Sequence, residues 1–159
     1  VTLQIKKGEN LALLGENGAG QSTLMSMIFG MYEPDEGEIF IRGKKEQIHS
    51  PSYATKLNIG MVHQHFKLVQ NYTITENIIL GLKKKDKLFG ILPYVDLKKA
   101  DQEIEALSKK YGLEVNPIDV IENTSVSTQQ RVEILKMLYR EAEILIFDEP
   151  TAVLTPQEI

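Results

Sequence analysis

The chain contains no cysteine. This excludes a disulfide framework and a thiolate metal site, and it is compatible with a reducing cytoplasm. Positive charge is also scarce, with 18 Lys and Arg against 22 Asp and Glu and a net charge of −4. Proteins that bind nucleic acid usually carry a basic face, so we expect no nucleic-acid partner. No apolar run approaches the roughly 20 residues of a membrane-spanning helix, so we expect any role at a membrane to be played from its surface.

The 159 residues are 42% hydrophobic and 25% charged, which is typical of a soluble globular domain or part of one. Alternation at residues 1–5 predicts a half-buried strand, followed by a turn at residues 6–9. Apolar patterns predict further strands at residues 11–14, 39–41, 59–62 and 144–147. The last run has no polar interruption, so we expect it to be buried on both faces. Strands that alternate with helices predict an α/β domain with a mainly parallel sheet.

Several helix starts can be located in the sequence. A short helix is predicted at residues 51–57, and Thr73 with Glu76 has capping-box spacing. An amphipathic pattern begins at Asp96 and stops at Gly112. Ser127 with Gln130 again has capping-box spacing before a helical run. The lysine-rich stretch at residues 83–95 reads as a surface insertion, either a solvated loop or a contact to anionic lipid headgroups.

A glycine-rich segment follows the apolar run at residues 11–14 and precedes a helical pattern. Strand, glycine-rich turn and helix in this order predict a phosphate site, because the glycines let successive N–H groups point inward and the helix adds its positive dipole end. Ser22 is placed to give its hydroxyl to Mg²⁺. The alternative is an ordinary tight turn, which would need neither the Ser-Thr pair nor a partner motif downstream. The predicted nucleotide-binding residues are Gly15, Glu16, Asn17, Gly18, Ala19, Gly20, Gln21, Ser22 and Thr23.

Two carboxylates, Asp148 and Glu149, end the apolar run at residues 144–147. Ligands bind outside the carboxyl ends of the strands in open parallel sheets. We expect Asp148 to hold Mg²⁺, directly or through water, and Glu149 to orient and deprotonate the water that attacks the γ-phosphorus. The alternative is that this pair only marks the point where a strand meets solvent.

These motifs, with Gln64 and the polar run at residues 125–131, fall in the order and spacing of ABC-type ATPases. The chain resembles that family over essentially its whole length. Residues 15–23, 61–66, 131–136 and 149–156 are similar, more narrowly, to the first module of tandem ATPases that power simple-sugar or nucleoside importers. The resemblance implies a P-loop NTPase fold of ABC type with an antiparallel N-terminal portion. It also implies a helical subdomain, at about residues 67–140, between the Q-loop and the Walker B strand.

The resemblance implies ATP and Mg²⁺ as ligands, and a second ATP-binding module and a transmembrane permease as partners. It implies a peripheral location on the cytoplasmic face of the membrane. Residues 15–23 correspond to the Walker A loop and residues 144–148 to the Walker B strand. Residues 152–155 correspond to the D-loop at the seam between two modules. A soluble ABC protein of DNA repair or translation is a further alternative, which the net charge and the Gln64 neighbourhood oppose.

The resemblance also implies roles for individual residues. Gln64 would be the Q-loop glutamine, which contacts Mg²⁺ or the attacking water and senses the permease. The flanking His63 and His65 could form a metal pair, but a third ligand is lacking. Residues 124–128 stand at the signature motif, which presents a helix N-terminus to the nucleotide of the opposite module. The implied catalytic residues are Glu149 and Gln64, the implied metal ligands are Ser22, Gln64 and Asp148, and the implied signature contacts are Ser125, Ser127 and Gln129.

The chain departs from the family pattern at two important positions. Gln21 stands where the Walker A loop has lysine, and a neutral hydrogen bond is roughly half as strong as a charge-assisted one. Ser127 replaces the second glycine of the signature and adds a Cβ where a phosphate must approach closely. We therefore expect weak ATP binding and very slow hydrolysis. The main expectation is ATP hydrolysis that powers import of a sugar or nucleoside, and the alternative is a degenerate module that binds ATP or dimerises but hydrolyses poorly.

Some parts of the family pattern fall outside the 159 residues. They are the strands after Walker B, a histidine that clamps the γ-phosphate, and an aromatic side chain that stacks on adenine. We therefore expect the chain to be a fragment. We also expect the sheet to have a gap beside the Walker B strand, which would leave backbone groups unpaired and favour aggregation.

Overall fold

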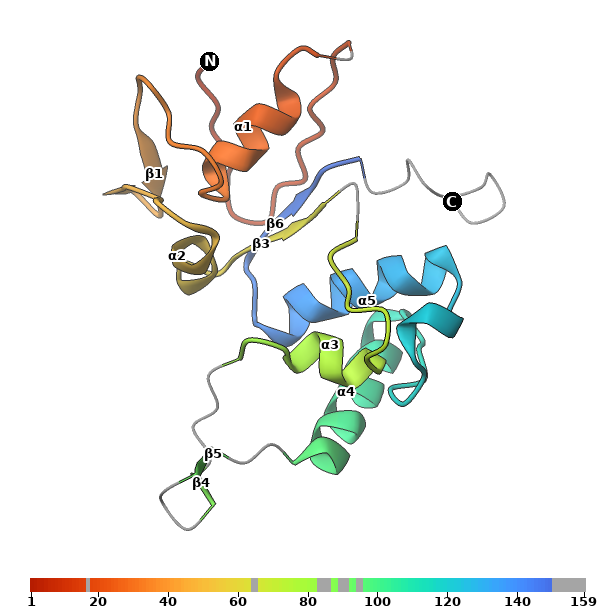
Figure 1. Cartoon of the computed structure of the whole chain (residues 1–159). Helices are drawn as coiled ribbons and strands as arrows, with labels where there is room; N and C mark the ends of the chain where they lie inside the picture. Colours follow the sequence, from red (N-terminus) through yellow and green to blue (C-terminus); the bar gives the residue numbers. More distant parts are fainter. Residues whose placement is uncertain (17, 64–65, 83–86, 89–91, 94–95, 150–159) are drawn as a thin grey trace.

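The structure is a computed structural model that describes residues 1–16, 18–63, 66–82, 87–88, 92–93 and 96–149 (Figure 1). It combines helices with short pieces of sheet. The elements in chain order are α1 (Gln21–Ile28), β1 (Ile39–Ile41), β2 (Lys44–Glu46), α2 (Pro51–Lys56), β3 (Ile59–Val62), α3 (Ile74–Ile79), β4 (Lys87–Leu88), β5 (Leu92–Pro93), α4 (Leu97–Tyr111), the 3-10 turn η1 (Ile121–Asn123), α5 (Val126–Tyr139) and β6 (Ile144–Phe147).

The central pairing joins β3 to β6 in parallel, with Ile59 opposite Ile144 and Val62 opposite Phe147. Both strands were predicted from their apolar runs, and their parallel pairing agrees with the expected sheet type. The predicted strand at residues 39–41 is β1, which pairs with β2 in an antiparallel hairpin. A second antiparallel pair, β4 with β5, lies in the lysine-rich stretch. The fold therefore has the expected parallel and antiparallel portions.

The predicted strands at residues 1–5 and 11–14 are absent from the described ladders. The turn between them does form, since the Glu9 N–H donates to the Lys6 carbonyl at 3.1 Å. A strand exists only when a neighbour accepts and donates its backbone hydrogen bonds. Within the described residues β6 has only β3 as a ladder partner, and neither N-terminal segment joins them. Side chains there remain open to solvent, with Leu14 94% exposed.

The prediction that β6 is buried on both faces is wrong. Ile146 is buried, but Leu145 and Phe147 are 40% and 44% exposed. Side chains alternate between the two faces of a strand. In the register of the pair, Ile146 lies opposite Met61 and on the face covered by α1 and α2. The other face is covered at β3, where Met137 of α5 packs beside Gly60, but Leu145 and Phe147 stay exposed at β6.

Two separate hydrophobic cores hold the described residues together. The first packs α1 and α2 against the sheet around Ile59, Met61 and Ile146. The second is helical and contains Leu68, Ile74, Ile78, Ile104, Ile121, Val132 and Leu135. Helices α3, α4 and α5 lie together around this second core (Figure 1). All its buried members fall between residues 68 and 135, so the segment between β3 and β6 builds its own core.

Local hydrogen bonds set the helix starts. Thr73 and Glu76 form a complete capping box at α3, and Asp96 caps α4, which ends at Gly112 in the left-handed conformation, as predicted. The predicted capping box of Ser127 with Gln130 is wrong, because α5 already begins at Val126. Its cap is Ser125, whose extended backbone lets the hydroxyl accept the Thr128 N–H at 3.1 Å. Among the described residues, no helix combines the length and the apolar character needed to cross a bilayer.

Candidate functional site

The glycine-rich loop turns tightly into α1. Gly18 and Gly20 have φ of 86° and 88°, a region that residues with a Cβ rarely adopt. The Ala19 N–H closes the turn on the Glu16 carbonyl at 3.0 Å. Gly20 is the N-cap of α1 and has no side chain to satisfy the first N–H groups of the helix. Among the described residues no side chain caps these donors, and the positive end of the helix dipole favours an anion there.

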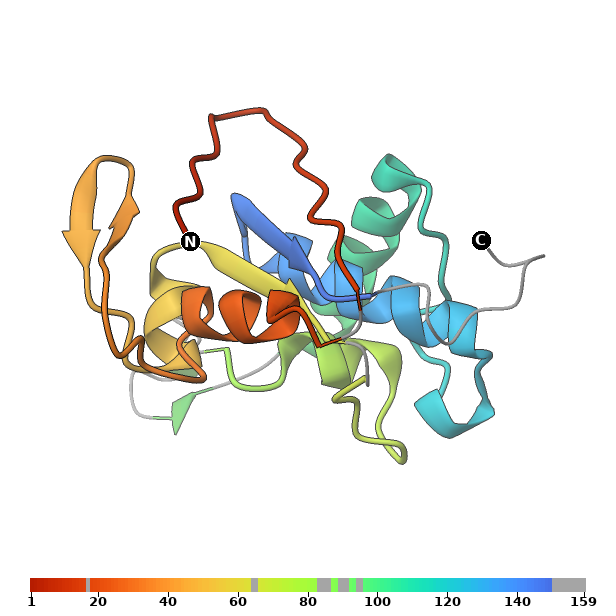
Figure 2. The same ribbon diagram turned by 90° about the horizontal axis from the view of Figure 1, so that it is seen from above.

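A hydrogen bond joins this loop to the carboxyl end of β6. The Ser22 hydroxyl donates to Asp148 Oδ1 at 2.9 Å across 126 positions of sequence. Seen from above, the end of β6 lies beside the turn that precedes α1 (Figure 2). The Asp148 N–H donates to the Val62 carbonyl at 3.1 Å, which extends the β3–β6 ladder to the carboxylate itself. The sheet therefore fixes the carboxylate against the start of the helix.

Gln21, the residue that replaces a lysine, turns back toward the backbone. Its Nε2 donates to the Leu13 carbonyl at 2.8 Å. The amide lies so close to the loop that a Cβ built on Gly15 would be 3.1 Å from it. Gly15 therefore leaves room for the amide, and the amide ties the entry of the loop to the start of α1. The bond to Leu13 uses one of the two N–H donors of the amide, so a hydrogen bond from Gln21 to a phosphate would have to come from the second donor with the side chain held in this position.

Glu149 follows Asp148 directly and leaves the strand in an unusual conformation. Its φ is 46°, in the left-handed region, and its side chain is exposed. The strand thus ends abruptly at the two carboxylates. Because neighbouring Cα atoms are about 3.8 Å apart, Glu149 begins close to the pair formed by Ser22 and Asp148.

The predicted signature residues lie at the start of α5, on a different element from the loop. Ser125 is the N-cap, and the Gln129 amide turns back to the Ile121 and Thr124 carbonyls at 3.3 and 3.4 Å. In the part of the chain that the structure describes, no hydrogen bond links Ser125, Ser127 or Gln129 to residues 15–23. The structure therefore brings Ser22 and Asp148 together but does not join the signature residues to them.

Two predicted site residues, Asn17 and Gln64, fall outside the described residues, and so does the predicted D-loop at residues 152–155. His65 is outside them as well. The neighbouring His63 is described, and its ring packs edge-on against Phe29 with 5.9 Å between centroids. Burial lowers the pKa of His63, and the positive charge of Lys67 lowers it further.

Sequence reasoning missed Glu133, which is 5% exposed on α5. Its Oε1 accepts the backbone N–H of Lys67 at 3.0 Å, so it holds the chain shortly after β3 leaves the sheet. The available signal was a carboxylate between the apolar residues Val132 and Leu135, on the buried face of the helix. A charged residue is rarely buried in this way unless it is paired.

Comparison with known proteins shows which family this chain is similar to. A family model described as "ABC transporter" matches residues 1–152. The nucleoside import ATP-binding protein NupA of Lactococcus lactis is 60% identical over 159 residues, and the guanosine import ATP-binding protein NupO of Bacillus subtilis is 58% identical over the same length. Both alignments cover 100% of this chain but 30% of the relative. The chain thus spans less than a third of the length of these relatives.

A solved structure gives the same picture at the level of the fold. The dimeric structure of a bacterial ABC transporter cassette is 29% identical to the chain, with a TM-score of 0.76. The alignment covers 98% of this chain and 67% of the other. This likeness confirms the α/β architecture expected from the sequence, with a parallel sheet, an antiparallel portion and a helical portion.

Proposed function

Because the chain belongs to the ABC transporter family, we propose that it binds ATP with Mg²⁺ and hydrolyses it to power import of a sugar or nucleoside. In this proposal it works at the cytoplasmic face of the membrane, beside a permease and a second ATP-binding module. Residues 67–140 would be its helical subdomain. The observation that carries the proposal is the 2.9 Å contact between Ser22 and Asp148, because it joins the phosphate loop to the carboxylate strand.

The residues at this contact suit a magnesium ion. Mg²⁺ prefers oxygen ligands and binds through one or two carboxylates together with substrate phosphates and water. Ser22 offers a hydroxyl oxygen and Asp148 a carboxylate oxygen, and the two atoms are already neighbours. Ser22, Asp148 and Gln64 are the residues that we propose to hold the ion. When bound, the ion would neutralise charge on the β- and γ-phosphate oxygens.

The remaining roles follow from where the side chains and backbone groups lie. The uncapped N–H groups at the start of α1 would hold the phosphates, since donors and dipole both favour an anion there. Glu149 would orient the attacking water and take its proton. Ser125, Ser127 and Gln129 would act on the nucleotide of the second module, because no hydrogen bond among the described residues joins the start of α5 to the loop.

The proposed cargo and partners rest on the relatives. NupA and NupO are by name nucleoside and guanosine import proteins, which supports a nucleoside or a chemically similar sugar as the imported solute. The related cassette of known structure is dimeric, which supports a second ATP-binding module.

A second candidate function is a degenerate module that binds ATP or dimerises without turnover. The position of Gln21 favours it, because the amide is already bonded to the Leu13 carbonyl. A lysine at this position would bring a positive charge to the phosphates. The loss of one preorganised donor in the transition state typically costs about 10² to 10³ in rate. The two candidates therefore share ATP binding and differ in turnover.

The deciding experiment measures ATP binding by calorimetry and steady-state phosphate release, with and without a partner module. We expect binding together with slow release, and we expect Glu149→Gln to lower release about 100-fold or more while ATP still binds. Glu122→Gln, at an exposed carboxylate of η1, is the matched control and should release phosphate at the rate of the unaltered chain. If the unaltered chain and Glu122→Gln both bind ATP but release no phosphate, the result supports the degenerate module. Absence of ATP binding overturns both candidates.

A further inference from the structure

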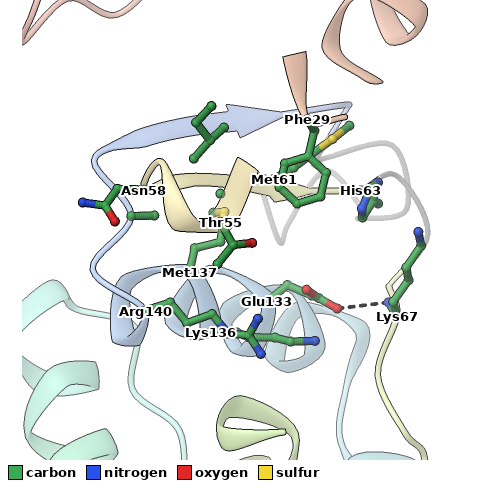
Figure 3. Close-up of a pocket in the computed structure, with 13 residues that line it drawn as sticks. Phe29, Thr55, Asn58, Met61, His63, Lys67, Glu133, Lys136, Met137 and Arg140 are labelled. Atoms are coloured by element: carbon green, nitrogen blue, oxygen red, sulfur yellow. Dashed lines mark hydrogen bonds between the residues drawn. The ribbon is translucent and has the colours of Figure 1, made fainter. Parts of the chain in front are cut away.

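A cavity of about 160 Å³ lies between β3 and α5, and one of its lining residues is His63, directly before Gln64 (Figure 3). Phe29, which follows α1, and Met61 of β3 line it on one side, and Met137 of α5 lines it on the other. The volume corresponds to about five water molecules in the liquid. The glycine-rich loop at residues 15–20 precedes α1, at the opposite end of the helix from Phe29, and a helix of eight residues is about 12 Å long.

Positive charge dominates the polar lining of this cavity. Lys67, Lys136 and Arg140 line it together with one carboxylate, Glu133, which leaves an excess of two positive charges. Figure 3 shows Glu133, Lys136 and Arg140 on the same helix, with Lys67 across from them. Glu133 is also committed to the backbone, since its Oε1 accepts the Lys67 N–H at 3.0 Å. One buried carboxylate therefore lies among three cations in the lining of the cavity and also accepts a backbone N–H.

The hydrogen bonds of Arg140 are incomplete. One terminal nitrogen of its guanidinium donates to the Leu80 carbonyl at 2.6 Å. Its Nε is buried and has no hydrogen-bond partner in the part of the chain that the structure describes. Burial lowers the pKa of both Lys136 and Arg140, and the negative charge of Glu133 opposes this decrease at both residues. The positive charge of Arg140 lowers the pKa of Lys136 further. The cluster thus lacks negative charge and has an unused buried donor.

We propose that this cavity binds the phosphate group of a small anion. A phosphate dianion would balance the excess of two positive charges and would supply acceptor oxygens for the Lys136 ammonium and the Arg140 guanidinium. Arginine and lysine are the side chains that proteins most often use for phosphate. The apolar walls, Phe29, Met61 and Met137, reduce water access and so strengthen the attraction between the charges. The shared chemistry is a phosphate group, carried either by free phosphate or by a small phosphate monoester.

The methionines allow a site-resolved test. The chain has five, of which Met61 and Met137 line the cavity, whereas Met25 and Met27 lie on α1 and Met31 follows it. In the full chain labelled with ¹³C at the methionine methyls, we expect added inorganic phosphate to shift the Met61 and Met137 signals saturably. Sodium chloride at the same ionic strength should not do so. A parallel titration with glycerol phosphate tells whether the monoester binds more tightly than free phosphate.

Variants test whether the cations are responsible. Lys136→Gln and Arg140→Gln should each weaken phosphate binding at least tenfold. Lys109→Gln, which removes an exposed lysine paired with Glu105, is the charge-matched control and should leave the affinity unchanged. The methyl spectrum without phosphate reports whether each variant is folded, and retained chemical shifts of Met25 and Met31 identify a folded variant. If one variant does not fold, the other carries the test.

Three outcomes would overturn the proposal. In the first, the Met61 and Met137 signals show no saturable shift in up to about 20 mM phosphate. That concentration is well above the Kd of about 1 mM that a weak site would have. The second is an equal affinity in the folded charge-removal variants and the control. The third is a shift confined to Met25 or Met27 and abolished by ATP, which would place the phosphate at residues 15–23. That third outcome would leave the proposed function intact, so the two proposals fail separately.

Discussion

The side-chain amide of Gln21 donates a hydrogen bond of 2.8 Å to the carbonyl oxygen of Leu13, at the entry to the phosphate loop. This bond uses one of the two N–H donors of the amide and holds the side chain against the backbone, at a position where the family pattern has a charged lysine directed at a phosphate. A charged donor to phosphate is stronger than a neutral one by about 1 kcal/mol. We therefore predict that Gln21→Lys raises the affinity for ATP about five- to tenfold, measured by calorimetry.

The control for this prediction adds the same charge elsewhere. Gln47→Lys introduces a lysine at an exposed position directly after β2, on a different element from the loop, and we expect it to leave ATP affinity unchanged. If Gln21→Lys gained no affinity, or if both variants gained equally, the account of the loop given above would be wrong.

The contact between Ser22 and Asp148 predicts coupling between these two residues. Ser22→Ala and Asp148→Asn should each reduce the gain in ATP affinity that Mg²⁺ provides, by about tenfold, because the first removes an oxygen ligand of the ion and the second removes the negative charge of another. The double variant should lose little more than either single variant, since residues that share a partner are not additive. Calorimetry with Mg²⁺ and with a chelator measures the effect.

Ser26→Ala, one turn further along α1, is the matched control and should keep the full response to Mg²⁺. Independent, additive losses in the double variant would mean that Ser22 and Asp148 do not serve the same ion.

The cap of α5 gives a stability prediction. Ser125→Ala removes the hydroxyl that accepts the Thr128 N–H and should lower the free energy of unfolding by about 1 kcal/mol. Ser127→Ala changes the same type of residue inside the first turn of the helix, where alanine is favoured, and should change the free energy of unfolding by less than about 0.5 kcal/mol. Urea unfolding followed by circular dichroism compares the two, and a larger loss for Ser127→Ala would reverse the assignment of the cap.

Gly60 gives a prediction about packing. A Cβ at this position would be 2.9 Å from Met137 Sδ and 3.0 Å from the Ala142 Cβ. Gly60→Ala should therefore lower the free energy of unfolding by about 1 to 3 kcal/mol, as overpacking does in well-filled cores. Because Met137 is the closest obstacle, the cost of Gly60→Ala should shrink when it is measured in a Met137→Ala background. An unchanged cost in that background would place the strain at Ala142 alone.

Local sequence determined most of the secondary structure. The apolar runs of β3 and β6, the capping box of Thr73 with Glu76, and the stop at Gly112 all depend on residues within a few positions of each other. The glycine loop and the carboxylates after β6 were likewise recognised from short motifs. The roles of Gln64, Ser127 and Gln129 remain predictions from resemblance, and Gln64 lies outside the described residues.

Tertiary structure decided what depends on distant partners. The neighbouring elements decide that Leu145 is exposed and that three cations lie near Glu133. They also decide that residues 1–5 and 11–14 pair with no other strand in the described part of the chain. The same holds for the contact of Ser22 with Asp148 across 126 positions. The physical reason is that helix caps and turns are satisfied by neighbouring atoms along the chain. Strand pairing, burial and charge balance are satisfied only by segments that the completed fold brings near.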